Sequence, residues 1–161
     1  MLTFDNRGLG QSSQPRGARL SIEQMADDAQ ALARAVGWDS CHVARHSMDG
    51  VIAQCLALRH SGFVRSLALL CTVANGADAA RITARKLWLG LRGRFGTRRC
   101  RQRAFLKMIL APGEFADADL DATAGRSFAC FGRDIADQPA IAMRQLAAMS
   151  RFDARPGLPV L

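Results

Sequence analysis

Hydrophobic positions in the first part of the chain follow the spacing of a helix. Apolar residues recur every three or four positions within Ser21–Gly37, which predicts an amphipathic helix. Ser21 and Gln24 form a capping box at its start, and Gly37 is placed to end it. The apolar positions of this helix are Ile22, Met25, Ala29, Leu32, Ala33 and Val36.

Two apolar segments flank a second predicted helix and have the pattern of strands. Cys41–His46 is the first, and Val64–Cys71 is a nearly continuous apolar run, typical of a parallel strand covered on both faces. Between them, Met48–Leu58 is rich in small apolar residues and predicts a helix that packs closely on a sheet. Leu2–Phe4 adds a short β-prone segment. The alternation predicts an α/β fold with a doubly wound parallel sheet and right-handed crossovers.

Helical spacing replaces the strand pattern after Thr72. We expect four helices here, at Asp78–Leu91, Thr97–Leu110 and Asp119–Phe131, and from Asp137 and Pro139 to about Arg151. The predicted apolar face of the Thr97–Leu110 helix consists of Cys100, Ala104, Phe105, Met108 and Ile109.

These elements predict a domain organisation in three parts. Residues 1–72 form a partial α/β core, residues 73–152 a helical cap, and residues 153–161 the start of a further core strand at Leu158–Leu161. Because the first and last predicted strands are short and lie at the ends of the chain, we expect the sheet to be incomplete.

Composition changes this picture only in part. The 49% apolar content excludes general disorder, and no apolar run approaches the roughly 18 residues that span a bilayer. The first residues do not resemble a signal segment, so we expect a cytoplasmic protein with no membrane partner. The five cysteines are widely spaced among apolar neighbours, and we interpret them as reduced. No CxxC pair or Cys/His cluster offers zinc ligands, and no cofactor is implied.

The formal charge of +8 comes from one segment. Ten basic and no acidic residues lie between positions 79 and 113, so the rest of the chain carries 12 basic and 14 acidic residues, or −2. Arg98, Arg99, Arg101 and Arg103 fall mostly away from the apolar face of their helix, as solvent-facing residues do. We therefore do not expect nucleic acid as a partner, although an arginine-rich contact surface is an alternative function.

A serine stands between the first full strand and its helix, in Ala44–Gly50, which reads Ala-Arg-His-Ser-Met-Asp-Gly. A serine hydroxyl is a poor nucleophile, and a sharp strand-to-helix turn helps by projecting Oγ from the sheet. The next N–H can then face an oxyanion. Ser47 is thus a candidate nucleophile and the Met48 N–H its oxyanion donor.

This turn resembles the elbow of the α/β-hydrolases, which reads Gly-His-Ser-Met-Gly-Gly in the esterase and lactonase branch. His46, Ser47, Met48 and Gly50 match it. The likeness extends over further segments, namely Thr3–Ser12, Ser21–Gly37, Val51–Gln54 and Val64–Leu70. The resemblance implies hydrolysis of a small-molecule carboxylic ester or lactone through an acyl-serine on Ser47.

Two positions depart from the elbow, because Arg45 and Asp49 stand where the family has glycine. Because these close-packed positions leave no room for side chains, we expect Ser47 to relax into an unproductive turn. An ion pair between Arg45 and Asp49 across the turn is a possible compensation.

The resemblance also implies a catalytic acid and then a histidine, in that order, after the serine. The only later histidine is His60, at the end of the helix behind the elbow, while His46 faces away along its strand and His42 lies further back. Asp78 follows the next strand but is placed as a helix N-cap. We therefore expect hydrolase activity to be impaired in this chain, a non-catalytic interaction module being the alternative; the oligomeric state is not indicated.

Overall fold

The computed structural model describes residues 1–13, 20–79, 88, 95–110, 113, 119–131, 134, 137 and 141–158. The chain divides into two compact units. The first unit comprises residues 1–81 together with 140–161, and the second comprises residues 82–139.

Helix α1 (Ile22–Ala35) opens the first unit and forms where its capping residues predict. Ser21 is extended, and its hydroxyl accepts a hydrogen bond from the Gln24 N–H at 3.2 Å. Gly37 follows the helix with φ +82°, and its N–H donates to the Arg34 carbonyl at 2.9 Å. The prediction of this helix and of both its ends is confirmed.

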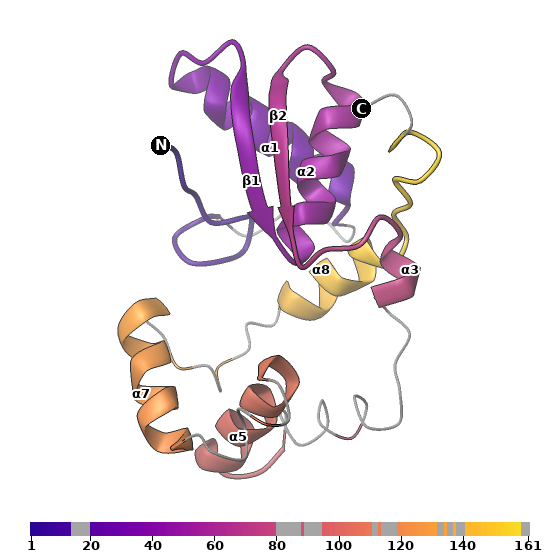
Figure 1. Ribbon diagram of the computed structural model, residues 1–161. Coiled ribbons are helices and arrows are strands. Elements are labelled where there is room, and N and C mark those ends of the chain that lie inside the picture. The colour runs from indigo at the N-terminus through magenta and orange to yellow at the C-terminus, as the bar shows by residue number, and fades with distance from the viewer. Residues whose placement is uncertain are drawn as a thin grey trace. The chain divides into compact units, whose positions relative to one another are not determined.

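The sheet consists of β1 (Cys41–His46) and β2 (Val64–Leu70), joined by helix α2 (Met48–Arg59). The two strands are parallel, with Val43 opposite Leu67 and Arg45 opposite Leu69. Helices α1 and α2 pack together on one face of the strands (Figure 1). The α/β prediction is confirmed, and the sheet is short in the part of the chain that the structure describes.

Leu2–Phe4 is the exception among the predicted strands. These residues carry no strand assignment, and no described strand forms a ladder with them. Leu2 instead packs its side chain against the hydrophobic core. Without a partner for its backbone groups, β propensity alone does not make a strand.

The hydrophobic core of this unit lies between the helices and the sheet. Ile22, Met25, Val51 and Cys55 are almost fully buried, and each large apolar side chain removed from water contributes about 1.5–3 kcal/mol. Helix α8 (Ile141–Met149) packs its end residues into the same core. Residues from the last part of the chain thus complete the packing of α1 and α2.

The segment after α8 is tied to the loop that follows β2. Ala154 donates its N–H to the Ala74 carbonyl at 2.8 Å, and Asn75 pairs with Asp153 in an isolated antiparallel bridge. A Cβ on Gly76 would lie 1.7 Å from the Met149 carbonyl oxygen, so only glycine fits at the start of helix α3 (Gly76–Ala79).

The prediction that Asp78 caps the next helix is wrong. Asp78 lies inside α3, and the Asn75 side chain caps it by accepting the Ala77 N–H at 2.8 Å. An asparagine side chain caps a helix as well as an aspartate does, and Asn75 directly precedes α3. The remainder of the predicted helix Asp78–Leu91 lies largely outside the described residues.

The second unit holds helices α5 (Arg98–Ile109) and α7 (Leu120–Phe131), both close to their predicted ranges. Thr97 caps α5 by accepting the Cys100 N–H at 3.3 Å. Leu106 is the most buried residue between the helices, and it was not on the predicted apolar face. Of that face Ala104 is buried, whereas the side chains of Met108 and Ile109 lie outside the described set.

Leu158 ends a turn, and residues 159–161, where a strand was expected, are not described. No helix in the described ranges is long and apolar enough to cross a membrane.

Candidate active site

Ser47 occupies the turn between β1 and α2 and has backbone angles of φ 56° and ψ −127°. A positive φ in a residue other than glycine costs on the order of 1–3 kcal/mol and persists only where the surroundings impose it. The prediction of a relaxed turn is therefore wrong: Ser47 keeps a strained conformation despite the side chains at positions 45 and 49. Its side chain is exposed.

Backbone hydrogen bonds hold both sides of this turn. The Ser47 N–H donates to the Leu70 carbonyl at 2.9 Å, which extends the β1–β2 pairing past the end of β1. The Ser47 carbonyl accepts the Gly50 N–H at 3.0 Å, which starts α2. The chain must therefore reverse from strand to helix within one residue, and Ser47 carries the strain.

Gly50 allows α2 to start this close to β2. A Cβ on Gly50 would lie 2.6 Å from both Cβ and Oγ1 of Thr72, the second residue after β2. Glycine is therefore required at position 50 because a Cβ would collide with Thr72, and not because the backbone has a positive φ. Of the three glycine positions in the family elbow, 45, 49 and 50, this chain has glycine only at position 50.

Gln54 fixes the same contact from inside the core. It is only 1% exposed, and its Nε2 donates to the Gly50 carbonyl at 3.1 Å and to the Val73 carbonyl at 3.0 Å. It therefore connects the first turn of α2 to the loop that carries Thr72. Sequence reasoning did not single out Gln54, although an amide within an otherwise apolar helical stretch was a usable signal.

The start of α2 offers hydrogen-bond donors beside the Ser47 hydroxyl. The first N–H groups of a helix have no partner inside it, and the helix dipole favours negative charge there. Ser47 is the N-cap residue, but its hydroxyl makes no capping hydrogen bond. The hydroxyl and the Met48 N–H are thus both at the end of β1, as a nucleophile and an oxyanion donor require.

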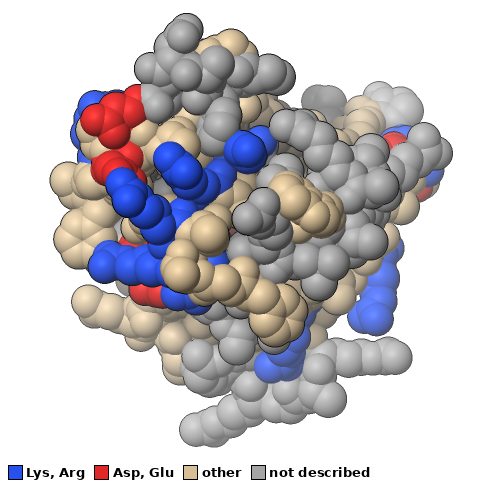
Figure 2. All heavy atoms as spheres, turned by 90° about the horizontal axis from the view of Figure 1, so that it is seen from below, with Lys and Arg blue, Asp and Glu red and all other residues tan. Residues whose placement is uncertain are grey.

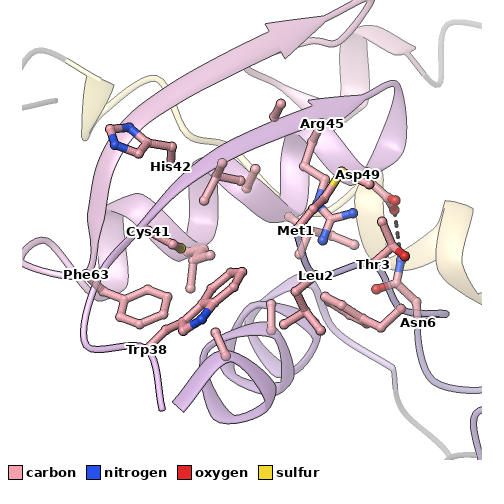
Figure 3. A pocket seen from close by; sticks show the side chains of 18 residues that line it. Met1, Leu2, Thr3, Asn6, Trp38, Cys41, His42, Arg45, Asp49 and Phe63 are labelled. Atoms are coloured by element: carbon pink, nitrogen blue, oxygen red, sulfur yellow. Dashed lines mark hydrogen bonds between the residues drawn. The ribbon is translucent and has the colours of Figure 1, made fainter. Parts of the chain in front are cut away.

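Arg45 and Asp49 do not pair with each other. The Arg45 guanidinium carbon lies 5.1 Å from the centroid of the Phe4 ring, and the Asp49 Oδ1 accepts from the Asn6 Nδ2 at 2.8 Å. Both side chains turn toward the N-terminal segment, which supplies their partners (Figure 3). The ion pair that was a possible compensation therefore does not form, because each side chain contacts a residue of the N-terminal segment instead.

The loop after this segment is held by polar side chains, as its composition suggests. Ser12 Oγ donates to the Asp5 carbonyl at 2.6 Å, and Arg7 binds Asp28 of α1 through two hydrogen bonds of 2.6 and 2.5 Å. The hydrogen bond to Asp28 raises the pKa of Arg7. A Cβ on Gly10, which has φ +48°, would lie 1.9 Å from Asp5 Oδ2. Asp5, Arg7 and Ser12 thus act structurally.

The three histidines lie in other surroundings than Ser47. His60 Nε2 is 2.9 Å from Asp27 Oδ1, at the end of α2 opposite the turn, about 18 Å away for a 12-residue helix. His42 Nδ1 is 2.7 Å from Ser66 Oγ on β2, and the His46 side chain is exposed on the same strand face as His42.

Metal-binding residues are not clustered in the described parts of the chain. No group of three His, Cys, Asp or Glu side chains there could hold a metal ion. Of the described cysteines, Cys41, Cys55 and Cys71 form no disulfide bond. The arrangement around Ser47 is therefore one of a hydroxyl, backbone donors and a helix end.

Comparison with known proteins places this strand, turn and helix in a family. The family model described as the alpha/beta hydrolase fold matches residues 1–98. The chain belongs to the α/β-hydrolase family.

Individual members of the family are similar over part of their length. The chain is 32% identical over 103 residues to "Probable lysophospholipase BODYGUARD 4" of Arabidopsis thaliana, covering 60% of this chain and 24% of that protein. It is 38% identical over 76 residues to "Putative carbamate hydrolase RutD" of Azorhizobium caulinodans, covering 47% and 27%. A solved hydrolase from Pseudomonas aeruginosa has the same fold, with a TM-score of 0.69 and 21% identity, covering 98% of this chain and 56% of that one.

The chain thus spans about a quarter of the length of these two curated relatives and about half of the length of the solved structure. The matched residues 1–98 include the whole of β1, the Ser47 turn, α2 and β2.

Proposed function

We propose that Ser47 is the nucleophile of a hydrolase that acts on a small carboxylic ester or lactone, with the Met48 N–H as an oxyanion donor. The observation that carries this proposal is the strained backbone of Ser47, at φ 56°, on an exposed turn at the start of a helix. Strained residues of this kind cluster at functional sites, where the strain can present a reacting group. Esters, lactones and carbamates share an electrophilic carbonyl carbon, which fits both curated relatives by name.

The reaction on this site forms a bond between Ser47 Oγ and the substrate carbonyl carbon. The carbonyl oxygen becomes negatively charged beside the Met48 N–H and the end of the α2 dipole, both of which stabilise it. The tetrahedral intermediate then expels the alcohol, and water hydrolyses the acyl-serine. A base must accept the Ser47 proton and return it to the leaving alcohol. His42 and His60 contact Ser66 and Asp27 instead, and we propose that His46, exposed on the same strand face as His42, does not serve either.

Activity in this chain is therefore expected to be weak. Asp49 adds a second reason, since its carboxylate lies in the first turn of α2. A negative charge in this first turn offsets part of the positive potential with which the helix end would stabilise an oxyanion. Ser47 thus has the strained turn of a nucleophile, but the lack of a base and the charge of Asp49 lower the expected rate of its reaction.

The arginine-rich segment does not favour a separate binding function. Arg99 binds Asp121 of α7 through two hydrogen bonds, and Arg98 binds the buried Asp134, which also accepts from Gln102. Figure 2 shows acidic side chains beside several of the basic ones. At least these two arginines connect parts of the second unit, which lowers the positive charge available to a partner.

A fluorophosphonate probe tests the nucleophile directly. The purified chain should acquire the probe at Ser47, slowly, and imidazole added as an external base should accelerate the labelling. Ser47→Ala should abolish it, while Ser61→Ala, which removes an exposed serine beyond α2, should not. Equal labelling of the Ser47→Ala variant would refute the assignment.

Restoring glycine separates the two proposed causes of weakness. The double variant Arg45→Gly with Asp49→Gly should label faster than the parent chain, with and without imidazole, because it removes the Asp49 charge. No gain in a variant that remains folded by circular dichroism would count against the proposed effect of these positions.

A further inference from the structure

Asn75 and Gly76 are the one Asn-Gly pair of the chain, and they lie between the end of β2 and the start of α3. In such a pair the glycine backbone nitrogen can attack Cγ of the asparagine side chain, because glycine has no Cβ to hinder ring closure. The nitrogen gives its proton to water or hydroxide, the bond from Cγ to Nδ2 breaks, and ammonia leaves a succinimide ring. Water then opens the ring at either carbonyl, which yields aspartate or isoaspartate.

The fold requires both residues of this reactive pair. A Cβ at position 76 would lie 1.7 Å from the Met149 carbonyl oxygen, so a larger residue cannot replace Gly76. The Asn75 Oδ1 accepts the Ala77 N–H at 2.8 Å and so caps α3. The same hydrogen bond places a donor on the oxygen that becomes negative when Cγ is attacked, which favours ring closure. Because Asn75 is only half-buried, water can reach it.

Residues 152–154, which follow α8, protect the pair from reaction. The Gly76 N–H donates to the Phe152 carbonyl at 2.9 Å, so the nitrogen that would attack keeps its proton. The Ala154 N–H donates to the Ala74 carbonyl at 2.8 Å, on the other side of the pair. Ring closure requires the backbone to rotate between these two hydrogen bonds. The reaction therefore requires this segment to detach first.

The products of the reaction do not fit the same arrangement. Asn75 lies opposite Asp153 in the antiparallel bridge, with its Nδ2 3.5 Å from Oδ2 of that carboxylate. Hydrogen bonds from Arg155 lower the pKa of Asp153, which is therefore charged at neutral pH. An aspartate at position 75 replaces the amide donor by a second negative charge, and like charges directly opposite each other are destabilising. Isoaspartate in addition lengthens the backbone by one carbon atom.

We propose that Asn75 is a site of spontaneous deamidation that residues 152–154 protect in the folded chain. The reaction occurs when this segment opens, and the acidic product hinders its return. Because Ile141 and Met149 of α8 pack in the core, the loss of this attachment loosens the helix as well. The modification thus records, irreversibly, the opening of this part of the first unit. It needs only water and is independent of any reaction at Ser47.

Peptide mass spectrometry of the full chain, kept in mildly alkaline buffer, measures the conversion of Asn75. Asn6, the other asparagine of the chain, precedes an arginine and is the internal reference. Asn75 in the folded chain should react more slowly than in a synthetic peptide of residues 72–79, by about tenfold or more, since an opening free energy of about 1.4 kcal/mol already gives this factor. Unfolding the chain in urea should remove the difference.

A matched pair of variants tests whether residues 152–154 are the barrier. Phe152→Ala removes a side chain that packs against the core and should accelerate the conversion of Asn75 by about fivefold to tenfold. Arg151→Ala, at the exposed neighbouring residue, should leave the rate unchanged. An unchanged circular dichroism spectrum confirms that each variant is folded.

A second pair of variants tests the effect of the product. Asn75→Asp imitates the aspartate product, and Asn75→Ser is its control, because both side chains can cap α3 but only aspartate adds a charge. Amide exchange of Gly76 and Ala154 should be about twofold to fivefold faster in Asn75→Asp than in Asn75→Ser, which corresponds to a like-charge repulsion of up to about 1 kcal/mol. Adding Asp153→Asn to Asn75→Asp should remove most of this difference.

Three results would overturn the proposal. The first is conversion of Asn75 in the folded chain at the rate of the peptide, which would mean that the fold does not protect it. The second is a Phe152→Ala variant in which residues 152–154 exchange faster while Asn75 does not convert faster. The third is equal amide exchange of Gly76 and Ala154 in Asn75→Asp and Asn75→Ser, which would mean that the product does not hinder the return of the segment.

Discussion

Gly50 approaches Thr72 so closely that a Cβ on Gly50 would lie 2.6 Å from the Thr72 Cβ. This contact joins the first turn of α2 to the segment just after β2. The Ser47 turn, between β1 and α2, directly precedes that first turn, so the close approach lies beside the strained residue.

Substitution Gly50→Ala should destabilise the chain by about 1–3 kcal/mol, the usual cost of adding atoms to a packed site. The measurement is the free energy of unfolding in urea. Gly62→Ala is the matched control, because no atom lies within 4 Å of a Cβ at that position and its φ is not positive. The second substitution Thr72→Gly should recover much of the loss. Equal effects of Gly50→Ala and Gly62→Ala would show that the contact is not tight.

Gln54→Leu should also lower the free energy of unfolding, by about 1–3 kcal/mol, since it leaves the Val73 carbonyl without its partner in the core. The leucine has a similar size, so lost hydrogen bonding and not lost volume causes the effect. Gln24→Leu on the exposed face of α1 provides the comparison. A neutral or stabilising Gln54→Leu would mean that the amide does not hold this loop.

Much of the first unit could be predicted from the sequence because its signals are local. The capping residues Ser21 and Gly37 and the apolar runs of β1 and β2 lie within or beside the elements they define. The contact of Gly50 with Thr72 joins positions on separate elements, and so does the hydrogen bond from Ser47 to Leu70 that holds the strained turn. No pattern near Ser47 distinguishes a relaxed turn from a strained one, so the expectation for this residue was wrong.

The same reasoning explains the partners of Arg45 and Asp49. Arg45 contacts Phe4 and Asp49 binds Asn6, each some forty positions away along the chain. The sequence indicated only that Arg45 and Asp49 are close to each other. In the second unit Leu106 is buried because α7 packs against it, and the periodicity of α5 alone does not predict where α7 lies.

The stability of the first unit should fall in acid through Asp27. Hydrogen bonds from Arg59 and then His60 lower the pKa of this carboxyl below its ordinary value of 3.8. A depressed pKa in the folded state means that the unfolded chain takes up the proton more readily, so the stabilisation is present above 3.8 and is lost as the pH falls through the folded value. The effect is small because the side chain is 45% exposed.

Asp27→Asn should therefore reduce the urea midpoint at neutral pH and have a smaller effect below pH 3.8. Asp39→Asn, at a side chain that is 99% exposed, is the control and should change little at either pH. A difference between Asp27→Asn and the parent chain that does not shrink in acid would contradict the role given to the Arg59 and His60 contacts.

The cysteines should differ widely in reactivity. Burial raises the pKa of Cys55 to about 12, which leaves almost no thiolate near neutral pH, whereas Cys71 is exposed after β2. Iodoacetamide should thus modify Cys71 first and Cys55 only as the chain unfolds. Peptide mass spectrometry at timed intervals gives each rate. Rapid alkylation of Cys55 in the folded chain would show that the core between α1, α2 and β1 opens readily.

Arg45 and Asp49 should hold the N-terminal segment against the start of α2. Arg45→Ala removes the contact with the Phe4 ring, worth about 0.5–1 kcal/mol at an exposed site, and Asp49→Ala removes the hydrogen bond from Asn6, worth about 0.5–1.5 kcal/mol. Exchange of the amides of residues 3–6 should accelerate in each variant and most in the double variant. Arg65→Ala, on the exposed side of β2, should leave these amides unchanged. If the double variant exchanges no faster than the parent chain, the apolar contacts of Leu2 with the core position this segment, and the two residues that replace the family's glycines are then incidental to it.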